Sequence, residues 1–162
     1  MKKILLTSLL LPIGLSAQID NNIEGITVNT PCKIEFARSS KGINNYTCTT
    51  QKGQDKIINF SIDVESMSSR MANLSEKGLS DFKNTYFTVV KNMAESNNES
   101  TEFITISGIK ALKSRGTMNY QGQVIYTTTI TLLYNKKSYI INALTNISNS
   151  TTLNEFVKRI KL

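Results

Sequence analysis

The chain of 162 residues contains no histidine and no tryptophan, and it has only two cysteines and two prolines. Without histidine, the chain has no Ser-His-Asp or Cys-His nucleophile system and no histidine-ligated zinc or copper site. The imidazole switch that responds to pH near neutrality is excluded too. These absences remove the commonest hydrolytic machinery, so no cofactor or metal is expected and an enzyme is not the favoured interpretation.

Long hydrophobic runs are also lacking, except in the opening segment MKKILLTSLLLPIGLSAQ. Lys2 and Lys3 precede an apolar stretch over residues 4–15, and small or polar residues follow, which is typical of a secretory signal peptide. The stretch is too short to cross a bilayer, which takes roughly 20 residues. We therefore expect residues 1–17 to be a cleaved signal peptide, with the cut after Ala17 or Ser16. A buried first element of the fold is the alternative.

Removal of that leader would leave residues 18–162 as a single exported domain, periplasmic or secreted, with no transmembrane segment. The formal net charge of +7 would fall to +5, because Lys2 and Lys3 leave with the leader. The remaining basic residues are scattered, apart from Lys136-Lys137 and a group near residue 160. Nucleic-acid-binding proteins usually gather their positive charge on one stripe, so no nucleic-acid partner is expected.

The two cysteines, Cys32 and Cys48, flank a segment with the pattern of a β-hairpin. Apolar and polar residues alternate on both sides of residues 39–42, which are typical of a turn. A turn centred at residue 40 places Phe36 opposite Asn44 and Cys32 opposite Cys48. In an oxidising compartment we expect a disulfide that stabilises the fold by about 3 kcal/mol. Two buried free thiols are the alternative, and the missing Cys-x-x-Cys spacing argues against a redox role.

The hydrophobic periodicity changes several times along the chain. Residues 55–65 alternate as a strand does. Residues 79–96 have helical spacing, with Ser80 as the candidate N-cap and an apolar face made of Leu79, Phe82, Tyr86, Val89, Val90 and Met93. Short links of the kind that join antiparallel neighbours separate four further predicted strands, over residues 102–107, 109–118, 122–134 and 137–145. The closing segment TLNEFVKRIKL carries the apolar stripe of a second helix.

These elements predict an α+β fold, sandwich-like, with one antiparallel sheet of about six to seven strands. The element order is β-hairpin, β, α, β-meander, α, and both helices are expected to pack on the sheet. In the strand at 122–134 one face is apolar and the other semi-polar, so the second face is expected to be only partly covered.

The second half of the chain holds a Gly-x-x-Ala strand, a long strand, a Tyr-bearing strand and a closing helix. The residues in these places are Gly108, Ala111, Gly122, Tyr139 and Phe156. In this order of elements, over residues 24–162, the chain resembles the PsbP-like superfamily, which includes extrinsic photosystem subunits, a Ran-binding nuclear-import factor and many exported bacterial proteins. The resemblance implies a non-enzymatic binding or accessory module, although a shared fold does not carry function with it.

Three groups of residues are candidates for chemistry. Asp63 and Glu65 share one strand face and would suit a paired acid and base or two calcium ligands, although a solvated face is favoured. Ser68-Ser69-Arg70 and Lys113-Ser114-Arg115 each place serine beside a cation, without a recognisable surrounding motif.

The third group, Tyr134, Lys136, Lys137 and Tyr139, surrounds a predicted hairpin tip. Aromatic rings beside cations can bind an acidic partner, a glycan or a nucleic-acid base, while inward-packed tyrosines at a soluble turn are the favoured alternative.

The sequence therefore favours an exported, non-catalytic binding or accessory module that contacts a protein or envelope component. An immunity- or inhibitor-type protein that neutralises a secreted toxin or hydrolase is the second hypothesis. A hydrolase that uses carboxylates or serine is the third.

Overall fold

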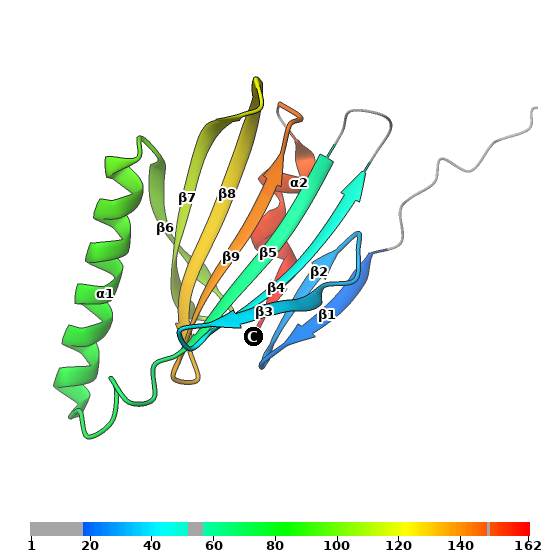
Figure 1. The fold of residues 1–162 in the computed structure, drawn as a ribbon. Coiled ribbons are helices and arrows are strands. Elements are labelled where there is room, and N and C mark those ends of the chain that lie inside the picture. The colour runs from blue at the N-terminus through cyan, green and yellow to red at the C-terminus, as the bar shows by residue number, and fades with distance from the viewer. Residues whose placement is uncertain (1–17, 52–56, 149) are drawn as a thin grey trace, which may run out of the picture.

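Two antiparallel β-sheets make up most of the computed structural model of the chain, which describes residues 18–51, 57–148 and 150–162 (Figure 1). The predicted signal peptide, residues 1–17, lies outside the described residues. The fold of these described segments is α+β and is dominated by its sheets, with ten strands and one long helix. Among the helices of the described segments, none is both long enough and apolar enough to span a membrane.

The larger sheet has seven strands in the spatial order β3-β4-β5-β9-β8-β7-β6, and it confirms the predicted hairpin, strand and meander. Its strands are β3 (Glu35–Ser40), β4 (Ile43–Gln51), β5 (Ile57–Ser66), β6 (Ser100–Ile106), β7 (Ile109–Tyr120), β8 (Gln123–Tyr134) and β9 (Lys137–Thr145). Four of its links are two-residue turns with positive φ at both positions, namely 41–42, 107–108, 121–122 and 135–136. Turns of this kind match the right-handed twist of the strands they join.

The smaller sheet was not predicted. It consists of β1 (Ile19–Ile23), β2 (Ile26–Thr30) and the short strand β10 (Ile160–Lys161), in the order β1-β2-β10. Ile26, Val28 and Ile160 are buried, and Val28 lies opposite Ile160 in the ladder. This sheet therefore brings both ends of the described chain together on one face of the larger sheet.

The predicted second helix is wrong. The segment forms a single α-helical turn, α2 (Thr151–Asn154), then a 3₁₀ turn, η1 (Phe156–Arg159), and then β10. The apolar stripe of this segment does face the protein interior, since Leu153, Phe156 and Ile160 are buried in the main core. Helical spacing over so few residues is also satisfied by two successive turns, and pairing with β2 straightens the chain where the helix was expected to continue.

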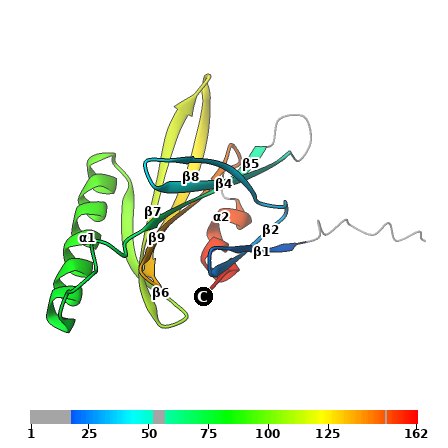
Figure 2. The same ribbon diagram turned by 60° about the horizontal axis from the view of Figure 1, so that its bottom comes forward.

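Helix α1 (Glu76–Ser96) and the smaller sheet lie on opposite faces of the larger sheet (Figure 2). The main core lies between the two sheets and includes the fully buried rings of Phe60, Tyr139 and Phe156. A smaller core under α1 is formed by Phe87 with Met67, Leu112 and Leu133. The helix contacts β6 and β7, so the second face of the sheet is only partly covered, as the semi-polar strand face predicted.

The start and the buried face of α1 differ from the prediction. The N-cap is Ser75, whose hydroxyl accepts a hydrogen bond from the Gly78 backbone N–H, and Ser80 lies inside the helix. Phe87 is buried, whereas Val89 and Met93 are exposed. The helix packs near the edge of the sheet, so only a narrow stripe of its apolar residues finds a partner surface.

The disulfide between Cys32 and Cys48 is confirmed, with 6.0 Å between the two Cα atoms. The hairpin register is not as predicted, because the turn lies at residues 41–42 and a bulge interrupts the ladder between Phe36 and Arg38. Phe36 therefore faces Tyr46 instead of Asn44. Cys32 precedes β3 and reaches Cys48 from outside the ladder.

Candidate functional site

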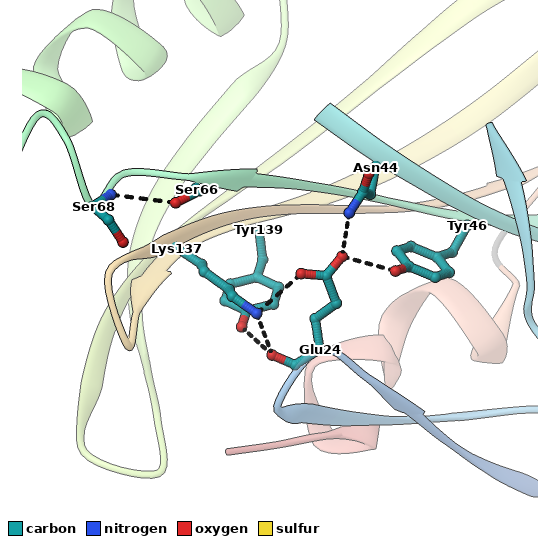
Figure 3. Close-up of polar contacts among 7 residues, drawn as sticks. All are labelled: Glu24, Asn44, Tyr46, Ser66, Ser68, Lys137 and Tyr139. Carbon is teal, nitrogen blue, oxygen red and sulfur yellow. Dashed lines mark hydrogen bonds and ion pairs between the residues drawn. The ribbon is translucent and has the colours of Figure 1, made fainter. Parts of the chain in front are cut away.

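The predicted hairpin-tip group is only partly a surface feature. Tyr139 is fully buried and its hydroxyl donates to the main-chain carbonyl of Glu24 at 2.9 Å. Lys137 Nζ lies 3.0 Å from Glu24 Oε2 and 3.2 Å from the same carbonyl (Figure 3). Tyr134 is half-buried against the main core, and Lys136 is exposed in the turn. The structure thus turns Lys137 and Tyr139 inward, toward Glu24.

Glu24 is the centre of a polar cluster that the sequence patterns did not predict. Its Oε1 accepts hydrogen bonds from Asn44 Nδ2 at 2.8 Å and from the Tyr46 hydroxyl at 2.7 Å. Burial raises the pKa of Glu24, but the hydrogen bonds from Asn44, Tyr46 and Lys137 outweigh it and hold that pKa below its ordinary value. Burial, then the hydrogen bond to Glu24, raises the pKa of Tyr46 to about 12.

This cluster, defined by Glu24, Asn44, Tyr46, Lys137 and Tyr139, fastens the two sheets together. Glu24 has φ 49° and lies in the turn between β1 and β2, while its partners belong to β4 and β9. The polar side-chain atoms of these five residues form hydrogen bonds with other members of the cluster (Figure 3). The cluster therefore serves as a structural clamp between the sheets. The signal available in the sequence was the Glu-Gly pair between two short alternating runs, which is typical of a two-residue turn.

The carboxylates Asp63 and Glu65 are not brought together into a site. Asp63 Oδ1 accepts from Asn45 Nδ2 at 2.7 Å, and Glu65 forms an ion pair with Arg70 at 2.9 Å. Among the residues that the structure describes, no three histidine, cysteine or carboxylate side chains converge as metal ligands would. Each carboxylate therefore has its own polar partner on the face of β5 that points away from the main core.

A groove of about 400 Å³ lies at the end of the larger sheet away from the Glu24 cluster, on the face that packs against the smaller sheet. Strands β7 and β8 provide one side, and the segment that leads into α2 provides the other. The groove is lined by Arg115, Thr117, Tyr126, Thr128, Ile147 and Leu153, and by Asn98 and Ser100 from the link between α1 and β6.

The groove exists because β6 is shorter than its neighbour. The first residue of β6, Ser100, lies opposite Arg115, and β7 continues to Tyr120 with β8 as its only described partner. The resulting β7–β8 hairpin stands beyond the other strands in both views (Figures 1 and 2). Met118, Tyr120 and Val124 on this hairpin are about half exposed.

The charged residues beside the groove differ in their pairing. Lys113 forms an ion pair with Glu102, and its hydrogen bond is the main cause of the lowered pKa of Glu102. Arg115 is exposed, and no carboxylate of the described residues lies within 4.0 Å of it, although its charge helps to lower the pKa of Glu102. The guanidinium is therefore available to a carboxylate from outside the chain.

The serine between these two cations does not form a nucleophile site with them. Successive side chains of a strand point to opposite faces, so Ser114 lies on the other face of β7 from Lys113 and Arg115. It is also buried, at 5% exposure. The groove thus combines hydroxyls, apolar side chains and one cation in a form suited to binding.

No family model matches this chain, and no curated protein matches it. A crystal structure from Bacteroides thetaiotaomicron is similar with a TM-score of 0.46 and 9% identity, covering 84% of this chain and 44% of that one. This chain therefore spans less than half the length of that protein. A Pseudomonas aeruginosa protein of unknown function, described as a candidate regulator, is similar with a TM-score of 0.41 and 15% identity, covering 79% of this chain and 82% of that one.

Proposed function

We propose that this chain is an exported, non-catalytic binding module that contacts a protein partner of the cell envelope or surroundings through the groove beside β7. The observation that carries the proposal is the coincidence of this groove with an edge of β7 that has no described partner strand. The β7–β8 hairpin adds exposed apolar side chains on both of its faces, with Met118 and Tyr120 on one face and Val124 on the other.

Two features support the export part of the proposal. Residues 1–17 have the order of charge, apolar stretch and small residues that secretion requires. The Cys32–Cys48 bridge belongs to an oxidising compartment. The PsbP-like resemblance stays a prediction, and the proposed binding mode does not depend on it.

Site-specific photo-crosslinking tests the proposal. A photoreactive amino acid is placed at Thr117 beside the groove or, as the control, at Thr85 on the exposed face of α1, and each protein is incubated with envelope and culture-fluid fractions of the native host. We expect a discrete adduct at position 117 only. Unlabelled wild-type protein should compete for it, and an Arg115→Glu variant should not.

Adducts of equal intensity at both positions, or competition by Arg115→Glu, would refute the groove as the contact surface. If the captured partner is an enzyme or toxin that loses activity in the complex, the immunity-type hypothesis gains support. Turnover of sugar or ester substrates by the purified oxidised protein would contradict the non-catalytic assignment.

A further inference from the structure

We propose that the partner contributes an extended segment that pairs with the free edge of β7 and places an acidic side chain against Arg115. This inference rests on the proposed function, because it specifies what the same groove binds. Addition of a strand to an exposed sheet edge is an established mode of peptide recognition, in which main-chain hydrogen bonds give affinity and side-chain pockets give specificity.

The turns at the two ends of β7 determine which backbone groups face the free edge. In a two-residue hairpin the residues that flank the turn exchange both hydrogen bonds, and the pattern then alternates along the strand. Tyr120 pairs with Gln123 across one turn, so the backbone of Tyr120, Met118 and Gly116 faces β8. The backbone N–H and C=O groups of Thr117 and Asn119 therefore point the other way, toward the free edge.

Two further observations agree with this assignment. Ile106 pairs with Ile109 across the turn at the other end of β7, which by the same alternation directs Arg115 toward β6. The hydroxyl of Ser100, the first residue of β6, donates to the Arg115 carbonyl at 3.4 Å. Beyond Ser100, no strand of the described residues other than β8 pairs with Thr117 or Asn119. Glu99 lies against Gly116, and Asn98 lines the groove with Thr117, so a bound peptide would enter past this link and meet the backbone groups of Thr117 and Asn119.

This edge lacks the features that usually prevent strand addition. Natural sheet edges are protected by bulges, charged residues or prolines. The opposite edge of the sheet, β3, has such protection, because a bulge interrupts it and it carries Arg38. Residues 116–123 of the β7–β8 hairpin, GTMNYQGQ, contain no charge and no proline. Their pairing with β8 runs without a register break.

The side chains around the edge indicate the chemistry of the bound segment. Side chains of an added strand would alternate between the face that carries Met118 and Tyr120 and the face that holds the groove. On the groove side they would meet Tyr126, Leu153 and Arg115. Arg115 forms no ion pair among the described residues, although its charge helps to lower the pKa of Glu102. The chain without its predicted leader is basic, at +5, because Lys2 and Lys3 leave the total of +7. An acidic segment is therefore complementary, whereas a second copy of this basic chain would bring like charges together.

The test uses a displayed library of random 12-residue peptides, selected on the immobilised, disulfide-bonded protein. We expect enriched sequences that alternate β-branched or aromatic residues and contain Asp or Glu. Affinity is then measured by fluorescence anisotropy for the most enriched peptide. Thr117→Pro, which removes an edge N–H that β8 does not use, should weaken binding about tenfold or more, as loss of one well-formed hydrogen bond and its neighbour predicts. The matched variant Thr117→Ala keeps that N–H and should stay within about threefold.

The charge is tested separately with Arg115→Gln and with peptides whose acidic residue is replaced by its amide. Each change should weaken binding to a similar extent, and the two together should cost no more than either alone. Hydrogen exchange of the Thr117 and Asn119 backbone amides should slow when the peptide binds, because the peptide would then accept hydrogen bonds from them. This readout reports pairing at the edge directly, whereas circular dichroism reports only whether the variants fold.

Failure to enrich any peptide, or equal binding by Thr117→Pro and Thr117→Ala, would overturn the inference. A peptide-independent dimer that Thr117→Pro dissociates would also overturn it, because a second copy would then occupy the edge. If crosslinking at position 117 still captures a folded partner specifically, the proposed function stands while this inference fails. If both fail, the groove is not a binding surface.

Discussion

Replacing Glu24 by glutamine should lower the stability of the protein, because one carboxylate fastens the smaller sheet to the larger one. Glutamine keeps the shape and can still accept from Tyr46 or Asn44, but it loses the charge and presents an amide N–H₂ to Lys137. Hydrogen bonds to charged groups contribute about 1.5–3 kcal/mol when well buried, and exposed ion pairs about 0–1 kcal/mol. The Glu24 and Lys137 side chains are 21% and 32% exposed, so we expect a loss of about 1–2 kcal/mol at pH 7.

The loss should depend on pH with a defined sign. The pKa of Glu24 lies below its ordinary value in the folded protein, so its contribution to stability is complete above the ordinary value of 4.5. That contribution disappears as the pH falls through the lower folded pKa. The difference in unfolding free energy between wild type and Glu24→Gln should therefore be constant between about pH 6 and 8. It should shrink toward zero in acid.

Urea unfolding followed by circular dichroism, repeated across this pH range, measures the difference directly. The matched control is Glu35→Gln, because Glu35 pairs with Lys33 at 3.7 Å but both side chains are more than 70% exposed. The control should change stability by less than about 0.5 kcal/mol. An equal effect of both variants, or a Glu24→Gln deficit that persists in acid, would refute the clamp.

Four other measurements test separate parts of the structure. The pKa of Tyr46 is about 12 in the folded protein, against 10.0 ordinarily, so the wild type should lose unfolding free energy as the pH rises from about 10 to 12 and the unfolded chain ionises first. Tyr46→Phe should remove this part of the loss, and an unchanged alkaline slope would contradict the reasoning. Changing Cys32 and Cys48 to serine should cost about 3 kcal/mol in urea titrations, and reductant should then have no further effect. Phe156→Ala should cost about 3–5 kcal/mol, since the ring is fully buried; a surface-like cost would place the closing turns outside the core. Met93→Lys should change the unfolding free energy by no more than about 0.5 kcal/mol, because 63% of Met93 is exposed. A large loss would indicate that Met93 packs on the sheet, as the helical spacing predicted.

Most of the larger sheet could be predicted from the sequence, because its strands alternate in polarity and four of its links are recognisable two-residue turns. The register of β3 with β4 could not, because a bulge between Phe36 and Arg38 shifts it. The alternation in residues 58–64 is fully matched by burial, since Ile58, Phe60, Ile62 and Val64 all lie in the main core. The disulfide was predictable for a related reason, since the sequence has only one possible pair. Local pattern decides such elements, and tertiary packing only confirms them.

The smaller sheet was hidden because its first strand buries a polar residue. Asn21 is only 6% exposed, its amide donates to Thr30 Oγ1 at 2.9 Å, and its carbonyl accepts from the Ile34 N–H at 2.7 Å. In the sequence IDNN such residues are typical of a loop. A buried asparagine becomes favourable only when its partners surround it, and those partners come from β2 and the chain before β3.

The groove could not be predicted for a different reason, since it depends on the positions of two turns, one before β6 and one after β7. Helix α1 ends at Ser96, and Asn98, with φ 60°, redirects the backbone so that β6 begins at Ser100. At the far end of β7, the positive-φ pair at residues 121–122 postpones reversal until after Tyr120. Each turn can be recognised locally, but the unpaired length of β7 depends on both turns together. The groove beside it also needs Ile147, Ser150 and Leu153, which come from a distant part of the sequence. That edge carries no charge, and it lies beside Arg115, which has no described ion-pair partner. The difference in length between β6 and β7, which local sequence patterns do not reveal, is therefore the feature that a partner strand would recognise.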